Sequence, residues 1–476
     1  MTTSRTLTRR AFTHDALLAA AASAVVPATL FAASPARRKD GDPLRVAVLG
    51  VRGRGRAHIA GFTNSKDSVV TCICDPDEGV IEPAQMAVPE ARYVKDLRRV
   101  MDDDRIDVVS IATPNHWHSL AAILALDAGK HVYVEKPVSQ TLGDGLALVA
   151  AAARSGKVVQ TGTQARSHPA TREAIAWMRA GGLGRVLRAT GLCYKRRESI
   201  GKVDGPQDPP ATLDYDLWCG PAPLVPLRRA SLHYDWHWSF DTGNGDIGNQ
   251  GVHQVDIARW GLGVDGFPRS AVSVGGRFGY DDDGETPNTH VVHYDCGDTE
   301  LVFEVRGLVT EPYRGANIGV VFECEDGYLV SSAYNHVVAY DANGVEVRSF
   351  SGGSEQDHYQ NFLDAVRAGD PGAVNADATC GHVSAGWCHL GNVSHRLGRT
   401  AAPHDAHDEL GASDSSHTAL ARTLEHLAAN QVATVGFEWT VGPEVRFDGE
   451  RFTGASSERA NALVQREARA PFVVPG

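Results

Sequence analysis

Basic residues are in short supply in this sequence, and their scarcity disfavours two classes of protein. The 476-residue chain has 46 Lys and Arg against 58 Asp and Glu, which gives a formal net charge of −12. Nucleic-acid binders and proteins of anionic membranes normally present a basic face, so neither class is expected. We expect a small-molecule partner instead, and the acidity favours a neutral substrate over an anionic one.

Cysteine is also sparse, since the chain has eight and no two of them form a CxxC pair. This pattern argues against a disulfide scaffold and shows no metal-ligand spacing. Five possible ligands do share one predicted helix near residues 378–397, but their mixed faces and small neighbours favour packing over metal binding. No metal site is expected. The five are Cys380, His382, Cys388, His389 and His395.

Long apolar runs are scarce as well, and the one that stands out lies at the N-terminus. Thr8–Phe12 contains paired arginines and precedes an Ala-rich run, Ala16–Ala33, which ends in Ser34-Pro35-Ala36. This order is typical of a secretory signal of the twin-arginine type. We expect residues 1–36 to be that signal, and the mature protein to be periplasmic or extracellular, off the membrane. A lone N-terminal anchor is the alternative.

The rest of the chain is ordinary in composition, with 42% hydrophobic residues, and its length predicts two or three domains. Residues 37–165 alternate short apolar runs with helical segments. This alternation predicts an α/β Rossmann domain, a doubly wound parallel sheet that binds NAD(P). The predicted strands are 44–51, 69–74, 108–112, 131–134 and 158–161.

Residues 166–476 follow a different pattern, in which strands succeed one another before two helical segments near 357–368 and 378–397. Such succession predicts an α+β domain with an open, mainly antiparallel sheet, which would serve substrate binding and oligomerisation and end in a C-terminal extension. The polar stretch 400–417 is expected to be an exposed connection. The predicted strands are 301–305, 318–323, 328–332, 337–340 and 345–350.

A glycine-rich loop follows the first predicted strand and precedes a helix. Glycines there let the backbone approach a pyrophosphate, and the helix N-terminus supplies N–H donors. The spacing departs from GxGxxG because position 52 is arginine, so a tight structural turn is the alternative. Asp75 ends the second strand, where a carboxylate binds a ribose 2′-hydroxyl and favours NAD, with NADP as the alternative. The predicted cofactor-binding residues are Gly50, Arg52, Gly53, Arg54, Gly55 and Asp75.

Three further motifs lie in the same half: Thr113–His118, Gly129–Val132 and Glu135–Pro137. Together with the glycine loop they resemble the Gfo/Idh/MocA oxidoreductases. The resemblance implies that Lys136 lies at the nicotinamide and the substrate, where an ammonium can polarise a reacting hydroxyl or ketone. A solvated surface lysine is the alternative. Cofactor contacts are likewise implied for Thr113, Pro114, Asn115, His118, Glu135 and Lys136.

Many dehydrogenases of that family carry Asp-x-x-x-His on a helix that faces the substrate, and the stretch 243–256 resembles it. His253 matches the histidine, but Asn249 stands at the aspartate position, and Asp246 lies one turn earlier. The resemblance implies that His253 is the general base, with Asn249 and Asp246 as further catalytic candidates. A structural histidine is the alternative.

Two segments and two single residues are predicted to contact substrate. Aromatic faces beside hydrogen-bonding groups suit sugars and polyols, although an aromatic core or a subunit contact would have the same composition. The two single residues follow the last Rossmann strand and would enter the domain cleft. The candidates are Tyr194, Lys195 and Arg197, then Tyr234, Trp236 and His237, and finally Gln164 and Arg166.

Taken together, these features predict a nicotinamide-dependent oxidoreductase that acts on a sugar or sugar derivative. The resemblance implies a tightly held cofactor, NAD or NADP, and a homo-oligomer, either a dimer or a tetramer. Two alternatives stay open: an NAD-dependent glycosidase that uses transient oxidation and elimination, and a non-catalytic sugar-binding protein.

Overall fold

A computed structural model describes residues 41–410, 413–432 and 436–474 of the chain. The predicted signal peptide, residues 1–36, lies outside the described residues. From Pro43 onward the chain forms one unit with its own dense internal contacts. No helix in the described part combines the length and the apolarity needed to cross a membrane.

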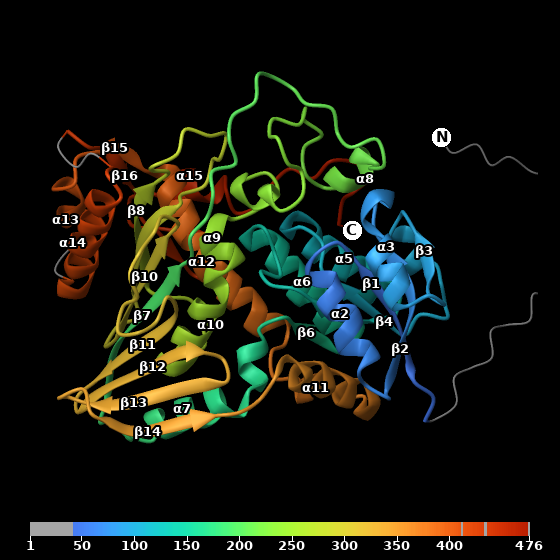
Figure 1. Ribbon diagram of the computed structural model, residues 1–476, viewed down its shortest axis with the longest axis horizontal. Coiled ribbons are helices and arrows are strands. Elements are labelled where there is room, and N and C mark those ends of the chain that lie inside the picture. The colour runs from blue at the N-terminus through green and yellow to red at the C-terminus, as the bar shows by residue number, and fades with distance from the viewer. Residues whose placement is uncertain (1–40, 411–412, 433–435, 475–476) are drawn as a thin grey trace, which may run out of the picture. The chain divides into compact units, whose positions relative to one another are not determined.

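The first half of this unit is a six-stranded sheet in which all strands run parallel, in the order β3-β2-β1-β4-β5-β6 (Figure 1). The chain order reverses between β1 and β4, and a doubly wound sheet binds its ligand at that point, outside the carboxyl ends of the strands. The strands are β1 (Leu44–Leu49), β2 (Ser68–Cys74), β3 (Arg92–Val94), β4 (Val108–Ile111), β5 (His131–Val134) and β6 (Val159–Thr161). The helices between them are α2 (Arg54–Thr63), α3 (Glu82–Ala87), α4 (Arg98–Met101), α5 (Asn115–Asp127) and α6 (Leu142–Ser155).

The second half is a ten-stranded sheet, ordered β14-β13-β12-β11-β7-β10-β9-β8-β16-β15, in which only β7 and β10 pair in parallel. The predicted fold class is confirmed. The strands are β7 (Val186–Tyr194), β8 (Ser270–Gly276), β9 (Thr289–Asp295), β10 (Glu300–Arg306), β11 (Ile318–Cys324), β12 (Gly327–Ala333), β13 (His336–Asp341), β14 (Glu346–Ser351), β15 (Arg399–Ala401) and β16 (Trp439–Val441). A separate hairpin joins β17 (Arg446–Phe447) to β18 (Phe452–Thr453).

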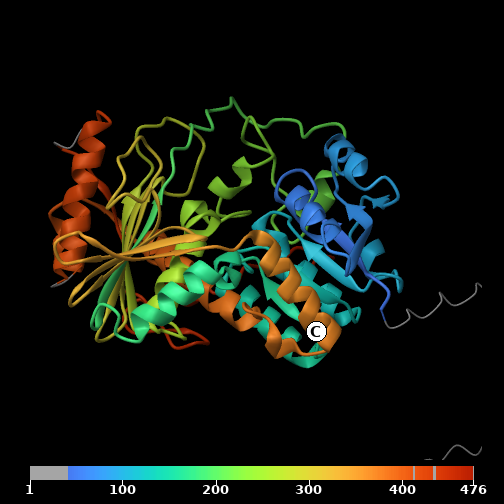
Figure 2. The ribbon, with the colours of Figure 1, turned by 60° about the horizontal axis from the view of Figure 1, so that its bottom comes forward.

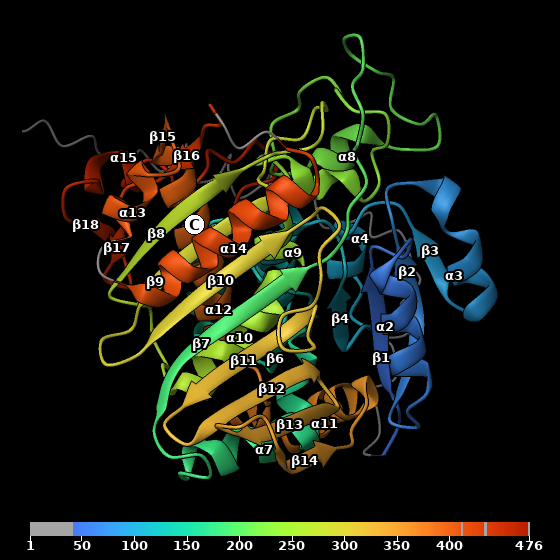
Figure 3. The same cartoon turned by 60° about the vertical axis from the view of Figure 1, so that its left-hand side comes forward.

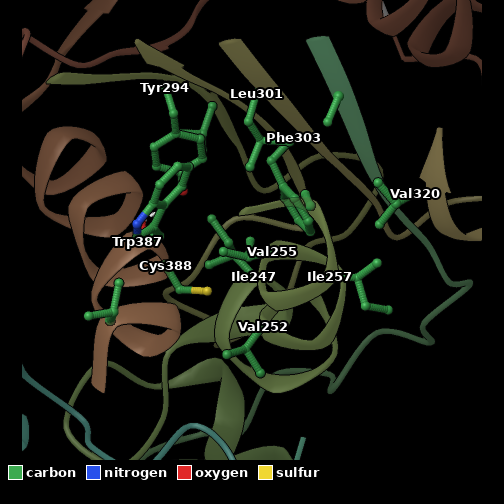
Figure 4. Close-up of a cluster of buried hydrophobic side chains, with 14 of the residues drawn as sticks. Ile247, Val252, Val255, Ile257, Tyr294, Leu301, Phe303, Val320, Trp387 and Cys388 are labelled. Atoms are coloured by element: carbon green, nitrogen blue, oxygen red, sulfur yellow. Dashed lines mark hydrogen bonds between the residues drawn. The ribbon is translucent and has the colours of Figure 1, made fainter. Parts of the chain in front are cut away.

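Helices cover both faces of this sheet. On one face, α10 and α12 pack against the strands, and their apolar side chains interlock with Phe303 and Tyr294 around the buried Trp387 (Figure 4). On the other face, α14 lies across β9 and β10 (Figure 3). The helices of this half are α7 (Pro169–Arg179), α8 (Tyr215–Cys219), α9 (Gly245–Asn249), α10 (Gly251–Leu262), α11 (Glu355–Ala368), α12 (Ala378–Leu397), α13 (Asp405–Glu409), α14 (Asp414–Ala429) and α15 (Ser457–Asn461).

The stretch 400–417 differs from the sequence expectation. It contains the end of β15, the whole of α13 and the start of α14, and it buries Ala406 and Leu410 against Trp439. Its polar composition indicated an exposed connection, but its few apolar side chains find a tertiary partner, and burial of such side chains overrides composition.

Helix α11 returns from the second half to the first, where it lies beside α2 (Figure 2). Its Tyr359 and Phe362 pack with Phe62 of α2 and Tyr133 of β5. This packing brings Glu355, at the start of α11, next to the glycine loop.

Candidate active site

A cavity of about 250 Å³ opens at the carboxyl ends of β1, β2, β4 and β5, where the parallel sheet reverses its strand order. Its walls include most of the predicted cofactor-binding residues. They also include one catalytic candidate, Asn249, and two substrate-contact candidates, Tyr234 and Trp236. The predicted residues that line it are Gly50, Arg52, Gly53, Arg54, Asp75, Thr113, Pro114, Asn115, His118, Glu135, Lys136, Asn249, Tyr234 and Trp236.

The glycine loop forms one wall of the cavity in a conformation that requires glycine at two positions. Gly50 has a φ of +80°, and a Cβ there would lie 2.7 Å from the Ala112 carbonyl oxygen. A Cβ on Gly55 would lie 1.8 Å from the Gly50 carbonyl oxygen, whereas Gly53 has open space around it. The first turn of α2 carries no side-chain cap, so its N–H groups are available to a phosphate. This cradle fits a dinucleotide.

Asp75 lies beside this loop and fastens it. Its carboxylate accepts hydrogen bonds from the backbone N–H of Val51, at 2.9 Å, and of Asp77, at 3.1 Å. Burial raises the pKa of Asp75 above its ordinary value, and the two backbone hydrogen bonds oppose that rise. The expected contact with a ribose stays a prediction, because both oxygens already hold the loop.

Residues 207–238, which we call the strap, leave the second half of the chain and cover the cavity. Figure 1 shows this green segment, with α8 in it, reaching toward the parallel sheet. Asp77 holds the strap, because its carboxylate accepts hydrogen bonds from Thr212 Oγ1 at 2.6 Å and from His233 Nε2 at 2.7 Å. The Trp117 indole donates to the Trp218 carbonyl oxygen at 3.0 Å. The strap residues that line the cavity are Leu217, Trp218, His233, Tyr234 and Trp236.

His118 joins two turns at the edge of the cavity. Its Nδ1 lies 2.6 Å from the Pro137 carbonyl oxygen and its Nε2 lies 2.7 Å from that of Thr113. The ring is buried, which lowers its pKa. His118 therefore fixes the position of the turn that carries Lys136, and its expected cofactor contact stays a prediction.

Glu135 is the centre of a buried polar cluster. Its Oε1 accepts hydrogen bonds from Arg54 Nε at 2.8 Å, His58 Nε2 at 3.1 Å and Gln164 Nε2 at 3.3 Å. Burial opposes the charge of Glu135, but Arg54 and His58 hold its pKa well below the ordinary value. Arg54 also pairs with Glu355 at 2.8 Å, so the cluster links the glycine loop to α11.

Lys136 points across the cavity toward α9. Its Nζ donates to the Asn249 carbonyl oxygen at 2.9 Å and lies 3.8 Å from Glu135 Oε2. Burial lowers the pKa of Lys136, and the charge of Glu135 opposes that change. The ammonium is thus held by one neutral acceptor and remains free to donate further hydrogen bonds.

His253 lies on α10, one turn after Asn249, and is only 8% exposed. Its ring stands 5.4 Å from that of Tyr334, and no described residue bonds its buried Nδ1. Burial, together with the charge of Lys136, lowers the pKa of His253 to about 3. The imidazole is therefore neutral at ordinary pH, the form that can accept a proton, and burial makes it a weaker base than a free imidazole.

Several predicted site residues lie outside the cavity, because each has a buried partner instead. Asp246 accepts from Arg197 Nε at 2.8 Å, which leaves neither charge free. Tyr194 donates to Glu304 at 2.7 Å. Burying a charge without a partner is costly, and these pairs remove that cost. The expected catalytic role of Asp246 and the expected substrate contacts of Arg197 and Tyr194 stay predictions.

The same holds for three more candidates. Arg166 Nε donates to Asp256 at 2.8 Å, and the ring of His237 bonds the Tyr234 carbonyl oxygen. Gln164 belongs to the Glu135 cluster. Their expected substrate contacts likewise stay predictions. Lys195 differs from all of these, since the one acceptor of its Nζ within the described ranges is the Gln250 side-chain oxygen, at 3.4 Å.

Sequence reasoning missed four residues of the site, namely Asp77, His233, Tyr334 and Glu355. Each gains its place through a contact with a distant segment. Tyr334, for example, lies in the turn between β12 and β13, and no local motif marks it. Of the four, only Asp77 carries a signal, because it directly follows the Asp75-Pro76 turn.

Comparison with known proteins identifies both halves. Residues 44–163 match the Gfo/Idh/MocA family domain described as an oxidoreductase family with an NAD-binding Rossmann fold. Residues 182–326 match the family's C-terminal alpha/beta domain. The expected NAD-type cofactor is thereby confirmed for the parallel half.

Curated relatives match parts of the chain. A glycosyl hydrolase family 109 protein from Shewanella pealeana is 34% identical over 129 residues, which cover 24% of this chain and 27% of the relative. Levoglucosan dehydrogenase from Pseudarthrobacter phenanthrenivorans is 28% identical over 228 residues, which cover 46% and 51%. The chain thus spans about a quarter to about a half of the length of these curated relatives.

Solved structures share the fold over most of the chain. A levoglucosan dehydrogenase in complex with NADH and levoglucosan superposes with a TM-score of 0.58 at 19% identity, covering 73% of this chain and 96% of that one. The WlbA dehydrogenase from Bordetella pertussis, in complex with NADH and UDP-GlcNAcA, gives 0.56 at 19% identity, covering 74% and 97%. At these identities the likeness shows the fold.

Proposed function

Since the chain carries both domains of the Gfo/Idh/MocA oxidoreductase family, we propose that it oxidises or reduces a sugar or sugar derivative with a tightly held nicotinamide cofactor. One observation carries this proposal. The Lys136 ammonium stands in the cavity at the carboxyl end of β5, held by the Asn249 carbonyl oxygen. An ammonium in that place donates to the substrate oxygen and stabilises negative charge that develops there.

Different residues would bind the cofactor, accept the proton and orient the substrate oxygen. Gly50, Gly55 and the first turn of α2 would hold the pyrophosphate, and the carboxylate of Asp75 favours NAD over NADP by repelling a 2′-phosphate. Bound nicotinamide supplies the acceptor or donor of a hydride. His253, neutral because burial lowers its pKa to about 3, accepts the proton of the substrate hydroxyl while Lys136 orients the oxygen.

The strap supports a tightly held cofactor, because it covers the cavity and is fastened to Asp77 by Thr212 and His233. The test begins with the purified protein. Nucleotide released by denaturation is identified by mass, and sugars and polyols are then screened for a change in the absorbance of the bound nicotinamide. We expect bound NAD and a stoichiometric change with at least one sugar. Protein without nucleotide, and without affinity for added NAD, would contradict the proposal.

A second candidate function is a glycosidase that oxidises a sugar carbon, eliminates the aglycone and returns the hydride. The resemblance of part of the chain to a glycosyl hydrolase family 109 protein favours it, as does the amide of Asn249 where many dehydrogenases carry aspartate. Cleavage of a glycoside without net change in nicotinamide would establish this function. Sugar binding that persists without any turnover, unchanged by Lys136→Ala, would instead indicate a non-catalytic binding protein.

Export by the twin-arginine route is part of the proposal. It rests on the sequence of residues 1–36, and it agrees with a trapped cofactor, because free NAD is scarce outside the cytoplasm and this route carries folded proteins. Replacement of Arg9 and Arg10 by lysine should retain the protein in the cytoplasm. A dimer or tetramer stays a prediction, which light scattering of the mature protein tests.

A further inference from the structure

A second ammonium lies at the substrate end of the site. Lys195 directly follows β7, and its Nζ donates to the Gln250 side-chain oxygen at 3.4 Å. Gln250 directly follows Asn249, whose carbonyl oxygen holds Lys136 Nζ. The two ammonium groups therefore approach consecutive residues in the short break between α9 and α10.

Lys195 is unlike its neighbours in the chain. Arg196 pairs with Glu198 at 3.1 Å, and Arg197 pairs with Asp246 inside the protein. Among the residues that the structure describes, no carboxylate lies within ion-pair distance of Lys195, which has only a neutral acceptor. A half-buried ammonium in that position is available to an anion.

The carboxylate of Glu135 serves Lys136, since its Oε2 lies 3.8 Å from Lys136 Nζ, and among the described residues it forms no ion pair with Lys195. Its Oε1 already accepts three hydrogen bonds, from Arg54, His58 and Gln164. After burial, the charges that lower the pKa of Lys136 include those of Lys195 and Arg197. Lys136 and Lys195 are thus close enough to repel each other, and an anion between them would relieve the repulsion.

Buried hydrogen-bonding groups without partners lie on the same side of α10. Gln254 stands one turn after Gln250 and is 1% exposed, and beyond the Tyr334 hydroxyl beside it no described residue accepts from its amide Nε2. His253 Nδ1 is buried and unpartnered as well. The Tyr334 hydroxyl lies against Gln250 and Gln254 and closes the group. An unsatisfied buried donor costs free energy, so this group favours a ligand rich in acceptors.

We propose that the substrate carries a carboxylate, as a uronate or an aldonate does, and that Lys195 binds it while Lys136 and His253 engage the reacting hydroxyl. A carboxylate offers acceptors only, which suits the ammonium of Lys195 and the amide of Gln254. This substrate class rests on the proposed function. It reverses the expectation drawn from the net charge of −12, because distant surface charges are screened beyond about 8 Å and the local groups decide.

The experiment compares sugars with their C6 acids: glucose with glucuronate, galactose with galacturonate, and mannose with mannuronate. The holoprotein is assayed by nicotinamide absorbance, and binding is measured by calorimetry. We expect the acid to be preferred in at least one pair. Lys195→Gln should raise KM for that acid by about tenfold or more, because a hydrogen bond between charged groups is lost, and leave its kcat unchanged.

Three controls make the result specific. Lys195→Arg should keep most of the affinity, and the KM for the neutral sugar should not change in Lys195→Gln. Arg196→Gln removes the same charge one position away, where Glu198 already neutralises it, and should behave as the wild type. Equal effects of Lys195→Gln on acid and neutral sugar, or no preference for any acid in the wild type, would overturn the proposal.

Calorimetry separates this inference from the proposed function. An acid that binds through Lys195 but is never oxidised would support the carboxylate site and contradict the oxidoreductase. If no acid binds, and wild type and Lys195→Gln oxidise neutral sugars equally well, the result would support the oxidoreductase and contradict the carboxylate site.

Discussion

The two ends of the proposed site are built differently. The cofactor end is the cavity itself and comes from turns that directly follow β1, β2, β4 and β5, so Gly50, Asp75 and Lys136 owe their places to the strands before them. The proposed substrate end lies beyond the residues that line the cavity and draws on α10, on the residue after β7 and on the turn between β12 and β13, which carry His253, Lys195 and Tyr334. A parallel sheet thus fixes the first end locally, whereas the second end exists only once the whole chain has packed.

The largest expected effect concerns the glycine loop, where the packing predicts that one glycine cannot be replaced. Gly55→Ala places a methyl group 1.8 Å from the Gly50 carbonyl oxygen, so the loop must move and the bound nucleotide should be lost entirely. Gly266→Ala is the control, because Gly266 does not line the cavity and nothing lies within 4 Å of its Cβ position. The nucleotide content of both purified variants is measured. Equal retention would show that this loop does not hold the cofactor.

Lys136→Met should give the next largest effect, because Lys136 belongs to both ends. The strand β5 places it, but α9 holds its ammonium. We expect kcat to fall by roughly 10³-fold, the range for loss of a group that stabilises developing charge, while nucleotide content stays normal. Lys66→Met, at an exposed position, controls for loss of a lysine. Loss of nucleotide together with activity would place Lys136 at the cofactor end alone.

Cofactor affinity and kcat should fall on opposite sides of neutral pH, because each depends on a group at a different end of the site. Burial raises the pKa of Asp75, so cofactor affinity should weaken on the acid side as this carboxylate becomes protonated. Burial lowers the pKa of Lys136 from its ordinary value of 10.5, so kcat should fall on the alkaline side as the ammonium loses its proton. His253, with a pKa of about 3, adds no acid limb to kcat near neutrality. Beyond each pKa the loss approaches about tenfold per pH unit.

Nucleotide dissociation and single-turnover reduction of the bound cofactor, each measured across the pH range, check this expectation. Asp75→Asn serves as the control, since it should remove the acid limb of cofactor affinity without touching the alkaline limb of kcat. Two limbs on the same side of neutrality would contradict the assignment.

The same difference explains what the sequence could predict. Five of the six parallel strands and their following turns were predicted close to their observed bounds, because buried runs and turn glycines are local signals, whereas the three-residue edge strand β3 was missed. The antiparallel strands 301–305 and 318–323 were also found, as β10 and β11. The strands β7, β8 and β9 were missed. The pairing of β7 with β10 and β11 is long-range, whereas β9 pairs with the next strand, β10, across a short turn.

Polar residues show most clearly what cannot be predicted from the sequence alone. Arg166, Tyr194 and Arg197 have the composition of a substrate surface, yet Asp256, Glu304 and Asp246 neutralise or bind them inside the protein. A sequence shows a charge but not its partner. Lys195, the residue after Tyr194, has no carboxylate partner among the described residues, and the sequence does not show this either.

The smallest expected effect concerns the strap, which joins the two ends. His233 belongs to the second half of the chain, but its ring donates to Asp77, two residues after the cofactor-binding turn. His233→Ala removes this partly exposed, charge-assisted hydrogen bond, worth about 1 kcal/mol, and should speed nucleotide release roughly fivefold. His336→Ala, on an exposed strand position, is the control. Release is followed by trapping free nucleotide with a second dehydrogenase.

Because Thr212 still donates to Asp77 in the His233→Ala variant, the double variant Thr212→Val with His233→Ala should release nucleotide faster than either change alone. Release at the wild-type rate in the double variant would mean that the turn after β2, and not the strap, retains the cofactor.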